Sequence, residues 1–280
     1  MAKGKVRKQT KGKPPKRSLP WFAWLGIGLA VVAIIVLVWV LPSGETASPT
    51  NSGEPRAAII DQLCAFDMPN QEFIEVVTDT LERYGFKIDL YQGDEITVDL
   101  YRTLPKQGYK LVIFRTHSGL IKSEGGAVVE TSLFTGESYS PNKYVREQLN
   151  GELVQARVDQ GYPFYFAISS KFITDRMKGR FEDTVIIVTG CSCLYLQDLS
   201  QAFIDKGASA YLAWDGTVGL DYVDDATMVL VQNLCSEGLT IEESVARTME
   251  EKGADPEWGA VLKYYPAQSG SKTVAKLIGG

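Results

Sequence analysis

Downstream of residue 55, short apolar runs alternate with segments of helical periodicity. Residues 109–115 (YKLVIFR) and 184–189 (TVIIVT) are almost continuously apolar, as is typical of strands buried on both faces of a parallel sheet. In residues 73–84 the apolar positions follow helical spacing, which predicts an amphipathic helix. Further strands are predicted at 57–60, 87–91, 96–101, 127–134, 164–169 and 210–214, and further helices at 142–150, 171–178, 198–206, 226–237 and 241–252. Strands that alternate with helices predict an α/β sandwich with a mostly parallel sheet.

Residues 21–41 (WFAWLGIGLAVVAIIVLVWVL) are the longest apolar run and contain no charged residue. As a helix with a rise of about 1.5 Å per residue, this run is about 31 Å long, which matches the hydrocarbon core of a bilayer. Trp21, Trp24 and Trp39 lie near its ends, where indole rings prefer the membrane interface. We expect one transmembrane anchor here. A cleaved signal peptide and a buried core helix are the alternatives.

Charge is distributed unevenly along the chain. Eight of the 29 Lys and Arg residues precede the first acidic residue, Glu45, and this basic flank places the N-terminus in the cytoplasm. Because all 34 Asp and Glu residues follow the anchor, the rest of the chain has a formal net charge of −13. An acidic body repels phosphates, so we expect no nucleic-acid partner.

These patterns divide the chain into four parts. We expect a basic cytoplasmic tail (1–20), a membrane anchor (21–41), a flexible linker rich in Ser, Gly, Pro and Thr (42–55) and an extracytoplasmic α/β domain (56–280). The sequence therefore predicts a single-pass protein of the cell membrane whose C-terminal domain is extracellular.

The two strongest strand predictions end in chemically reactive residues. Residues 109–115 lead to His117, and residues 184–189 lead to Cys191. If these strands are neighbours, an imidazole and a thiol lie at the same edge of the sheet, as a Cys/His hydrolase requires. Gly119 and Gly190 permit a close backbone approach beside them.

Other interpretations of these residues stay open. A lone histidine after a strand is more often structural than catalytic, and a cysteine there is often an inert small hydrophobe. Cys191 and Cys193 are also a candidate disulfide, redox pair or metal-binding pair with His117, but zinc normally takes three or four protein ligands. The single histidine excludes a multi-histidine metal site, and we expect no bound metal.

The sequence resembles the caspase-like cysteine peptidases, a group that includes caspases, gingipains, clostripain, separases and CHAT-domain peptidases. Three stretches carry the resemblance: LVIFRTHSG, which ends at Gly119, TVIIVTGCSC, which ends at Cys193, and FIDKGASAYLAWDGTV, at 203–218. The nearest likeness is to the gingipain, clostripain and CHAT-type members. The resemblance implies a three-layer α/β/α sandwich with a mostly parallel central sheet, here preceded by one transmembrane helix.

The resemblance also implies roles for individual residues. His117 matches the general acid/base and Cys191 the nucleophile that forms a thioester with the substrate. The oxyanion hole matches the backbone N–H of Cys191 and that of Ser118 or Gly119. Many members have glycine directly after the histidine, whereas this chain has Ser118 in between.

Two further clusters are weaker candidates. In this family an acidic pocket residue selects Arg or Lys substrates, and Asp215 beside Trp214 is a candidate for substrate binding, although Asp215-Gly216 is also a good turn dipeptide. A cluster of three carboxylates offers oxygen ligands for calcium, but its spacing matches no calcium loop; it consists of Asp221, Asp224 and Asp225. We therefore expect no bound cofactor, with calcium as the alternative.

Two functional hypotheses follow. The first is a membrane-anchored, outward-facing cysteine endopeptidase that acts on a protein or peptide substrate. The alternative is a catalytically silent caspase-like receptor or scaffold that binds a partner at the cell surface. A metal or redox protein that uses Cys191 and Cys193 is a third option.

Overall fold

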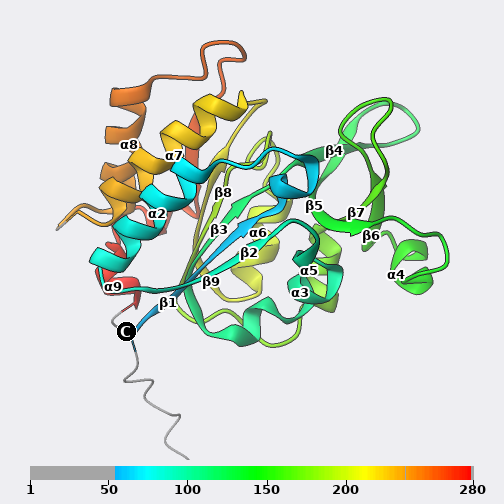
Figure 1. Ribbon diagram of the computed structural model, residues 1–280, viewed down its shortest axis with the longest axis horizontal. Coiled ribbons are helices and arrows are strands. Elements are labelled where there is room, and N and C mark those ends of the chain that lie inside the picture. The colour runs from blue at the N-terminus through cyan, green and yellow to red at the C-terminus, as the bar shows by residue number, and fades with distance from the viewer. Residues whose placement is uncertain (1–53, 237, 279–280) are drawn as a thin grey trace, which may run out of the picture. The chain divides into compact units, whose positions relative to one another are not determined.

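A six-stranded sheet forms the centre of the fold in a computed structural model that describes residues 54–236 and 238–278 (Figure 1). Neighbouring strands are parallel, except that the most C-terminal strand, at one edge of the sheet, is antiparallel to its neighbour. The order is β10 (Leu262–Tyr265), β9 (Ala208–Trp214), β8 (Thr184–Val188), β3 (Tyr109–Arg115), β1 (Arg56–Asp61) and β2 (Lys87–Gln92). The predicted α/β class with a mostly parallel sheet is therefore confirmed.

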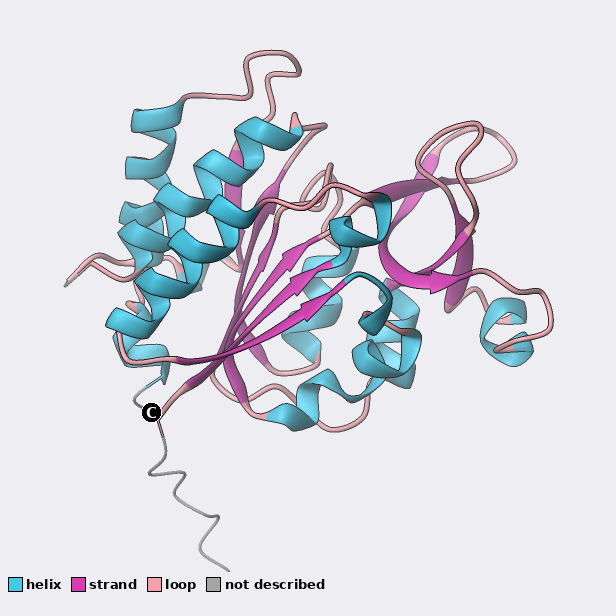
Figure 2. Ribbon diagram, in the orientation of Figure 1, coloured by secondary structure: helices cyan, strands magenta, loops and turns pink. Residues whose placement is uncertain are grey.

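Helices cover both faces of this sheet (Figure 2). One face carries α2 (Gln71–Arg83), α7 (Leu220–Leu234) and α8 (Ile241–Lys252), and the other carries α3 (Val98–Thr103), α5 (Ser170–Arg176) and α6 (Asp198–Asp205). Two short helices, α4 (Val145–Leu149) and α9 (Val274–Ile278), complete the set that the described residues contain. The sheet thus has a separate apolar core on each side.

The alternation of side chains along β3 shows how one strand serves both cores. Leu111 and Ile113 belong to the core under α2, α7 and α8, whereas Val112 and Phe114 belong to the core under α3, α5 and α6. Successive side chains of a strand point to opposite faces, so a strand covered on both sides is apolar at every position. This explains why residues 109–115 read as one continuous apolar run.

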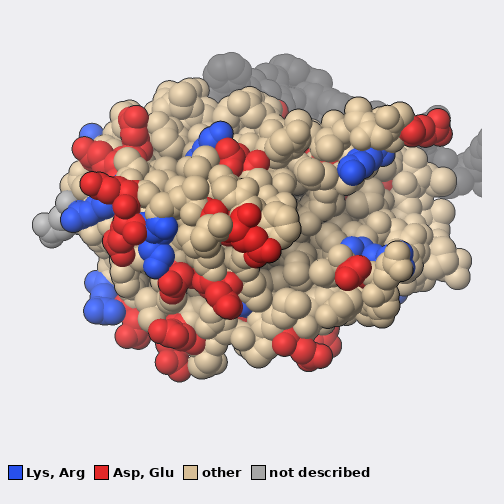
Figure 3. Space-filling model, turned by 90° about the horizontal axis from the view of Figure 1, so that it is seen from above, with Lys and Arg blue, Asp and Glu red and all other residues tan. Residues whose placement is uncertain are grey.

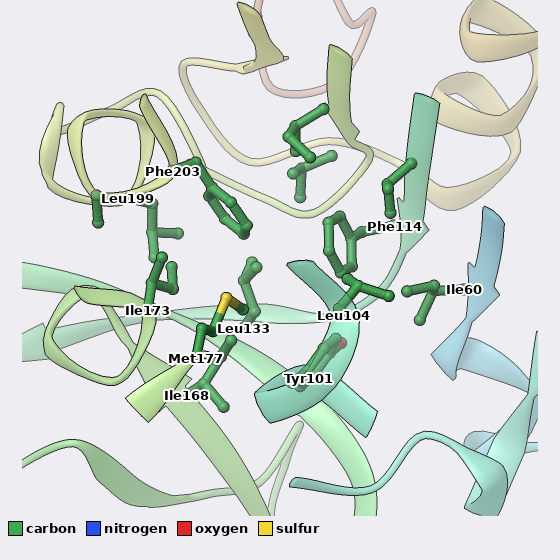
Figure 4. Packing of buried hydrophobic residues seen from close by; sticks show 14 of the residues in the cluster. Ile60, Tyr101, Leu104, Phe114, Leu133, Ile168, Ile173, Met177, Leu199 and Phe203 are labelled. Carbon is green, nitrogen blue, oxygen red and sulfur yellow. The ribbon is translucent and has the colours of Figure 1, made fainter. Parts of the chain in front are cut away.

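A second sheet of four antiparallel strands was not predicted. Its order is β4 (Ser118–Lys122), β5 (Val128–Ser138), β7 (Tyr165–Ser169) and β6 (Leu153–Ala156). Leu133 and Ile168 of this sheet pack into the same core as Phe114 (Figure 4). The strands predicted at 127–134 and 164–169 therefore exist, but they belong to this sheet rather than to the central one.

Two local predictions were wrong, and one strand of the central sheet was missed. Residues 96–101 form no strand, because the Thr97 side chain accepts a hydrogen bond from the Leu100 N–H and starts α3. Helix α7 begins at Leu220, six residues before the predicted start, since acidic residues in its first turns hid the apolar pattern. Strand β10 was missed because it has only four residues and alternates weakly.

The predicted tail, anchor and nearly all of the linker (1–53) lie outside the described residues. Among the residues that the structure does describe, no helix has the length and apolar character needed to cross a bilayer.

A buried ionic network ties the central strands to α7. Arg115, at the end of β3, is 1% exposed and pairs through Nη1 with Asp61 Oδ1 at 2.7 Å and through Nη2 with Asp224 Oδ2 at 2.8 Å. Asp61 ends β1 and Asp224 lies in α7. Burying these charges is costly unless all are paired, so the three elements are held in one arrangement.

We expect Arg115→Met to lower the free energy of unfolding by about 3–5 kcal/mol, because it leaves two buried carboxylates without their counter-ion. The matched control is Arg83→Met, which removes an ion pair to Asp79 whose side chains are 77% and 72% exposed. That change is expected to cost about 0–1 kcal/mol. Urea unfolding measures both, and equal losses would contradict the role given to Arg115.

Candidate active site

His117 lies in the short link between the two sheets. It follows the end of β3 by two residues and immediately precedes β4. Its backbone N–H donates to Gln62 Oε1 at 3.0 Å, and its carbonyl accepts from the Phe134 N–H of β5 at 3.0 Å. The backbone at His117 is therefore fixed by contacts to both sheets.

Gln62 is a positioning residue that sequence reasoning missed. It is fully buried, its Oε1 also accepts from the Thr116 hydroxyl at 3.2 Å, and its Nε2 donates to the Thr135 carbonyl at 3.1 Å. The position of Gln62 could have indicated this role, because it directly follows β1, and ligand sites of open α/β sheets lie at the carboxyl ends of the parallel strands.

The imidazole of His117 sits in an aromatic environment. Its ring centre lies 4.9 Å from that of Phe66, in an edge-on arrangement, and 5.9 Å from that of Phe134. Burial, together with the nearby Arg115 charge, lowers the pKa of His117 to about 4. The imidazole is therefore neutral at pH 7. Its Nε2 is buried and has no hydrogen-bond partner within the described part of the chain.

Cys191 follows β8 after Thr189 and Gly190. Its side chain is half-buried, and its sulfur lies 3.8 Å from the Val218 carbonyl oxygen. The carbonyl of Cys191 accepts a hydrogen bond from the Ser118 hydroxyl. Ser118, the residue that departs from the family pattern, thus joins the cysteine loop to the start of β4.

The residue after the cysteine has an unusual backbone conformation. Ser192 has a φ of 56°, in the left-handed region, and its N–H donates to the Gly216 carbonyl at 2.7 Å. The next contact, from the Leu194 N–H to the Trp214 carbonyl at 2.8 Å, attaches the loop to the end of β9. The cysteine loop is therefore held from two sides.

His117 and Cys191 line the same cavity. Strands β3 and β8 are parallel neighbours, with Phe114 paired to Val188, so the residues that follow them lie at the same edge of the sheet. The cavity has a volume of about 200 Å³. It is lined by Leu63, Met68, Thr116, His117, Thr189, Gly190, Cys191, Val218, Leu220 and Val223.

Asp215 and Trp214, the predicted substrate-binding residues, are not among the residues that line this cavity. The Asp215 carboxylate accepts from the Val261 N–H at 2.8 Å and pairs with Lys263 Nζ at 2.7 Å. Trp214 is 1% exposed and packs edge-on against Tyr222. The unpredicted strand β10 supplies the Lys263 cation, which the sequence pattern did not reveal.

Two of the three carboxylates in the acidic cluster of α7 make structural contacts. Asp224 binds Arg115 and also accepts from the Asn70 amide at 2.9 Å, and Asp225 pairs with Lys252 at 2.9 Å. Across residues 54–236 and 238–278, no group of three or more His, Cys, Asp or Glu side chains is arranged to hold a metal ion. All four cysteines are free, and burial raises the pKa of Cys193 to about 12, so that thiol keeps its proton.

The surface around the site is unevenly charged. Figure 3 looks down on the molecule from above the view of Figure 1 and shows that charged side chains gather toward the side of α2, α7 and α8, where acidic side chains are interspersed with basic ones. Toward the second sheet, charged side chains are sparse on this face.

Comparison of the chain with protein-family models and with curated protein sequences finds no match in either.

We expect Gly190→Ala to destabilise the site, because an added Cβ would lie 2.9 Å from the Thr116 carbonyl oxygen and 2.9 Å from the Ser118 hydroxyl. The predicted loss in the free energy of unfolding is about 1–3 kcal/mol. Gly125→Ala is the control, since its nearest neighbour lies 3.9 Å away, and it should change stability by less than about 0.5 kcal/mol. Indistinguishable denaturant midpoints for the two variants would refute the close approach.

The lowered pKa of His117 makes stability depend on pH. An unfolded chain binds a proton at histidine below about pH 6.5, whereas folded His117 does so only near pH 4, so acid favours unfolding in this window. Between pH 7 and 5 we expect a loss of about 2 kcal/mol in the wild type. Because His117 is the single histidine, His117→Gln should remove this loss, as urea unfolding at each pH would show. The same slope in both proteins would contradict the assignment.

Proposed function

We propose that the chain is a membrane-anchored, outward-facing cysteine endopeptidase of caspase-like fold. The observation that carries this proposal is the shared cavity, in which an unpartnered, neutral imidazole and a half-buried thiol follow adjacent parallel strands. We call His117 and Cys191 the candidate dyad. The six-stranded sheet with helices on both faces supports the caspase-like, three-layer part of the proposal.

The candidate dyad accounts for each proton in the proposed reaction. The thiol proton of Cys191 passes to His117, and the sulfur attacks the substrate carbonyl carbon to form a tetrahedral oxyanion. The C–N bond then breaks, and the leaving amine takes the proton from the imidazolium. Water, deprotonated by His117, hydrolyses the thioester and restores the thiol. A histidine that is neutral before reaction is in the correct state to accept the first proton.

The oxyanion is stabilised in this proposal by two backbone N–H groups. No hydrogen bond within the described residues engages the N–H of Cys191, which leaves it available as a donor. The second donor comes from Ser118 or Gly119 in β4. This strand lies at the edge of its sheet, so every second N–H along it points away from β5. Two such donors are the usual requirement for acyl transfer.

The membrane part of the proposal depends on the apolar run 21–41 and the basic flank before it. The linker 42–55 then gives the domain freedom to reach a protein or peptide substrate outside the cell.

A catalytically silent caspase-like receptor is the second candidate. The imidazole is packed against Phe66 and Phe134, and the burial that keeps it neutral also disfavours the imidazolium that catalysis requires. Activity measurements decide between the two candidates.

We expect Cys191→Ala and His117→Ala each to reduce peptide cleavage at least about 1,000-fold, because each removes one partner of the proton transfer. The experiment uses the full chain in mild detergent, a diverse peptide mixture and mass spectrometry of the products. Cys235→Ala is the matched control for loss of a cysteine, since Cys235 lies at the end of α7 and does not line the cavity.

Undiminished cleavage by either dyad variant would overturn the assignment. Absence of cleavage by a folded wild type, in the presence and absence of calcium, would favour the silent receptor. In that case Cys191 should be alkylated no faster than Cys64 or Cys235, whose pKa values burial raises to about 12.

A further inference from the structure

Apolar side chains from three separate segments line the cavity of the candidate dyad. Leu63 and Met68 come from the segment after β1, Val218 from the loop after β9, and Leu220 and Val223 from the first turns of α7. No charged side chain of the described residues lines this cavity. Besides the candidate dyad, Gly190 and two threonines, a substrate side chain that enters the cavity meets aliphatic and thioether groups.

Two buried carboxylates close in sequence to this wall, those of Asp61 and Asp224, are already neutralised by contacts of their own. Both carboxylate oxygens of Asp224 accept from Arg115, and Asp61 Oδ1 does so as well. The remaining oxygen, Asp61 Oδ2, accepts from the Cys64 thiol at 2.9 Å and lies 3.4 Å from the Gln92 amide nitrogen. A basic substrate side chain would have to break this buried network to use either of these two carboxylates as a counter-ion.

Asp215, the residue expected to select a basic side chain, is likewise unavailable. Its two oxygens are taken by the Val261 N–H and by Lys263, both at the β9–β10 edge. A charged substrate side chain would therefore lose its hydration in the cavity without gaining a partner, which strongly disfavours its binding.

The size of the cavity suits one apolar side chain. An apolar protein cavity of about 150 Å³ holds a benzene molecule, and this cavity has a volume of about 200 Å³. The side chain closest to the sulfur in a substrate complex belongs to the residue whose carbonyl is attacked. In such a complex, that residue would lie in the space beside Cys191.

We propose that the cavity formed by Leu63, Met68, Val218, Leu220 and Val223 binds an uncharged aliphatic side chain, of the size of Leu or Met, on the residue whose carbonyl Cys191 attacks. The inference rests on the proposed peptidase function and specifies its substrate class. It replaces the expected preference for Arg or Lys.

The first test compares cleavage of capped peptides that differ only at the attacked residue, which is Leu, Met, Arg or Asp. With the full chain, kcat/KM should be at least about 100-fold higher for Leu and Met than for Arg and Asp. Faster cleavage of the Arg or Asp peptide would overturn the inference and leave the peptidase proposal intact.

A charge placed in the cavity should change this preference. Leu220→Asp puts a carboxylate into the wall at the first position of α7, where the helix dipole tolerates an acidic residue. We expect it to raise kcat/KM for the Arg peptide relative to the Leu peptide at least about 10-fold. The matched control is Leu149→Asp, at a position that is 83% exposed in α4 and outside the cavity, and it should leave the preference unchanged. An equal shift in both variants would contradict the inference.

Binding to the Cys191→Ala variant separates the cavity from the chemistry. Calorimetry with the same peptides should show the Leu peptide binding at least about 10-fold more tightly than the Arg peptide, with or without turnover in the wild type. Selective binding of the Leu peptide without any turnover would overturn the peptidase proposal and support the apolar cavity. No difference between the Leu and Arg peptides would overturn the cavity proposal.

Discussion

The buried guanidinium of Arg115 imposes the constraint on which the site depends. A cation that is 1% exposed must have anionic partners, and here they come from the end of β1 and from α7. Arg115 precedes His117 by two residues, and α7 contributes Leu220 and Val223 to the cavity. The network therefore fixes the relative positions of the histidine segment and of one cavity wall. Its positive charge also helps to hold His117 neutral.

A second constraint is the close approach of the two strand ends. Gly190 lies so near Thr116 and Ser118 that a Cβ atom would collide with them, and the Ser118 hydroxyl binds the Cys191 carbonyl. Gln62 holds the backbone of His117 from the other side. Each of these contacts involves the backbone of at least one partner, which gives the candidate dyad little freedom to move. Such preorganisation is what the proposed chemistry requires.

Charge acts at two ranges in this domain. In the proposed peptidase, the net acidity of residues 42–280 would affect the approach of substrates over distances near the Debye length of about 10 Å. The proposed selection at the attacked residue would depend instead on the groups that touch it, which are mainly apolar. An acidic surface is therefore compatible with the proposed apolar specificity pocket.

The sequence alone determined the α/β class and the reactive residues at the strand ends. Strands such as 109–115 and 184–189 are buried on both faces, so their apolar runs are continuous and can be recognised from the sequence. The run 21–41 predicts an anchor equally clearly and stays a prediction, since it lies outside the described residues.

Only the tertiary structure decided what surrounds those reactive residues. Short strands such as β4, β6 and β10 are stabilised by pairing with distant segments, and four or five residues carry too little periodicity to reveal them. The ion pair of Asp215 with Lys263 and the hydrogen bond of His117 to Gln62 depend on strand register rather than on sequence spacing. Local sequence patterns thus identify the residues that can react, whereas the cavity and its apolar lining arise from contacts between segments far apart in the chain.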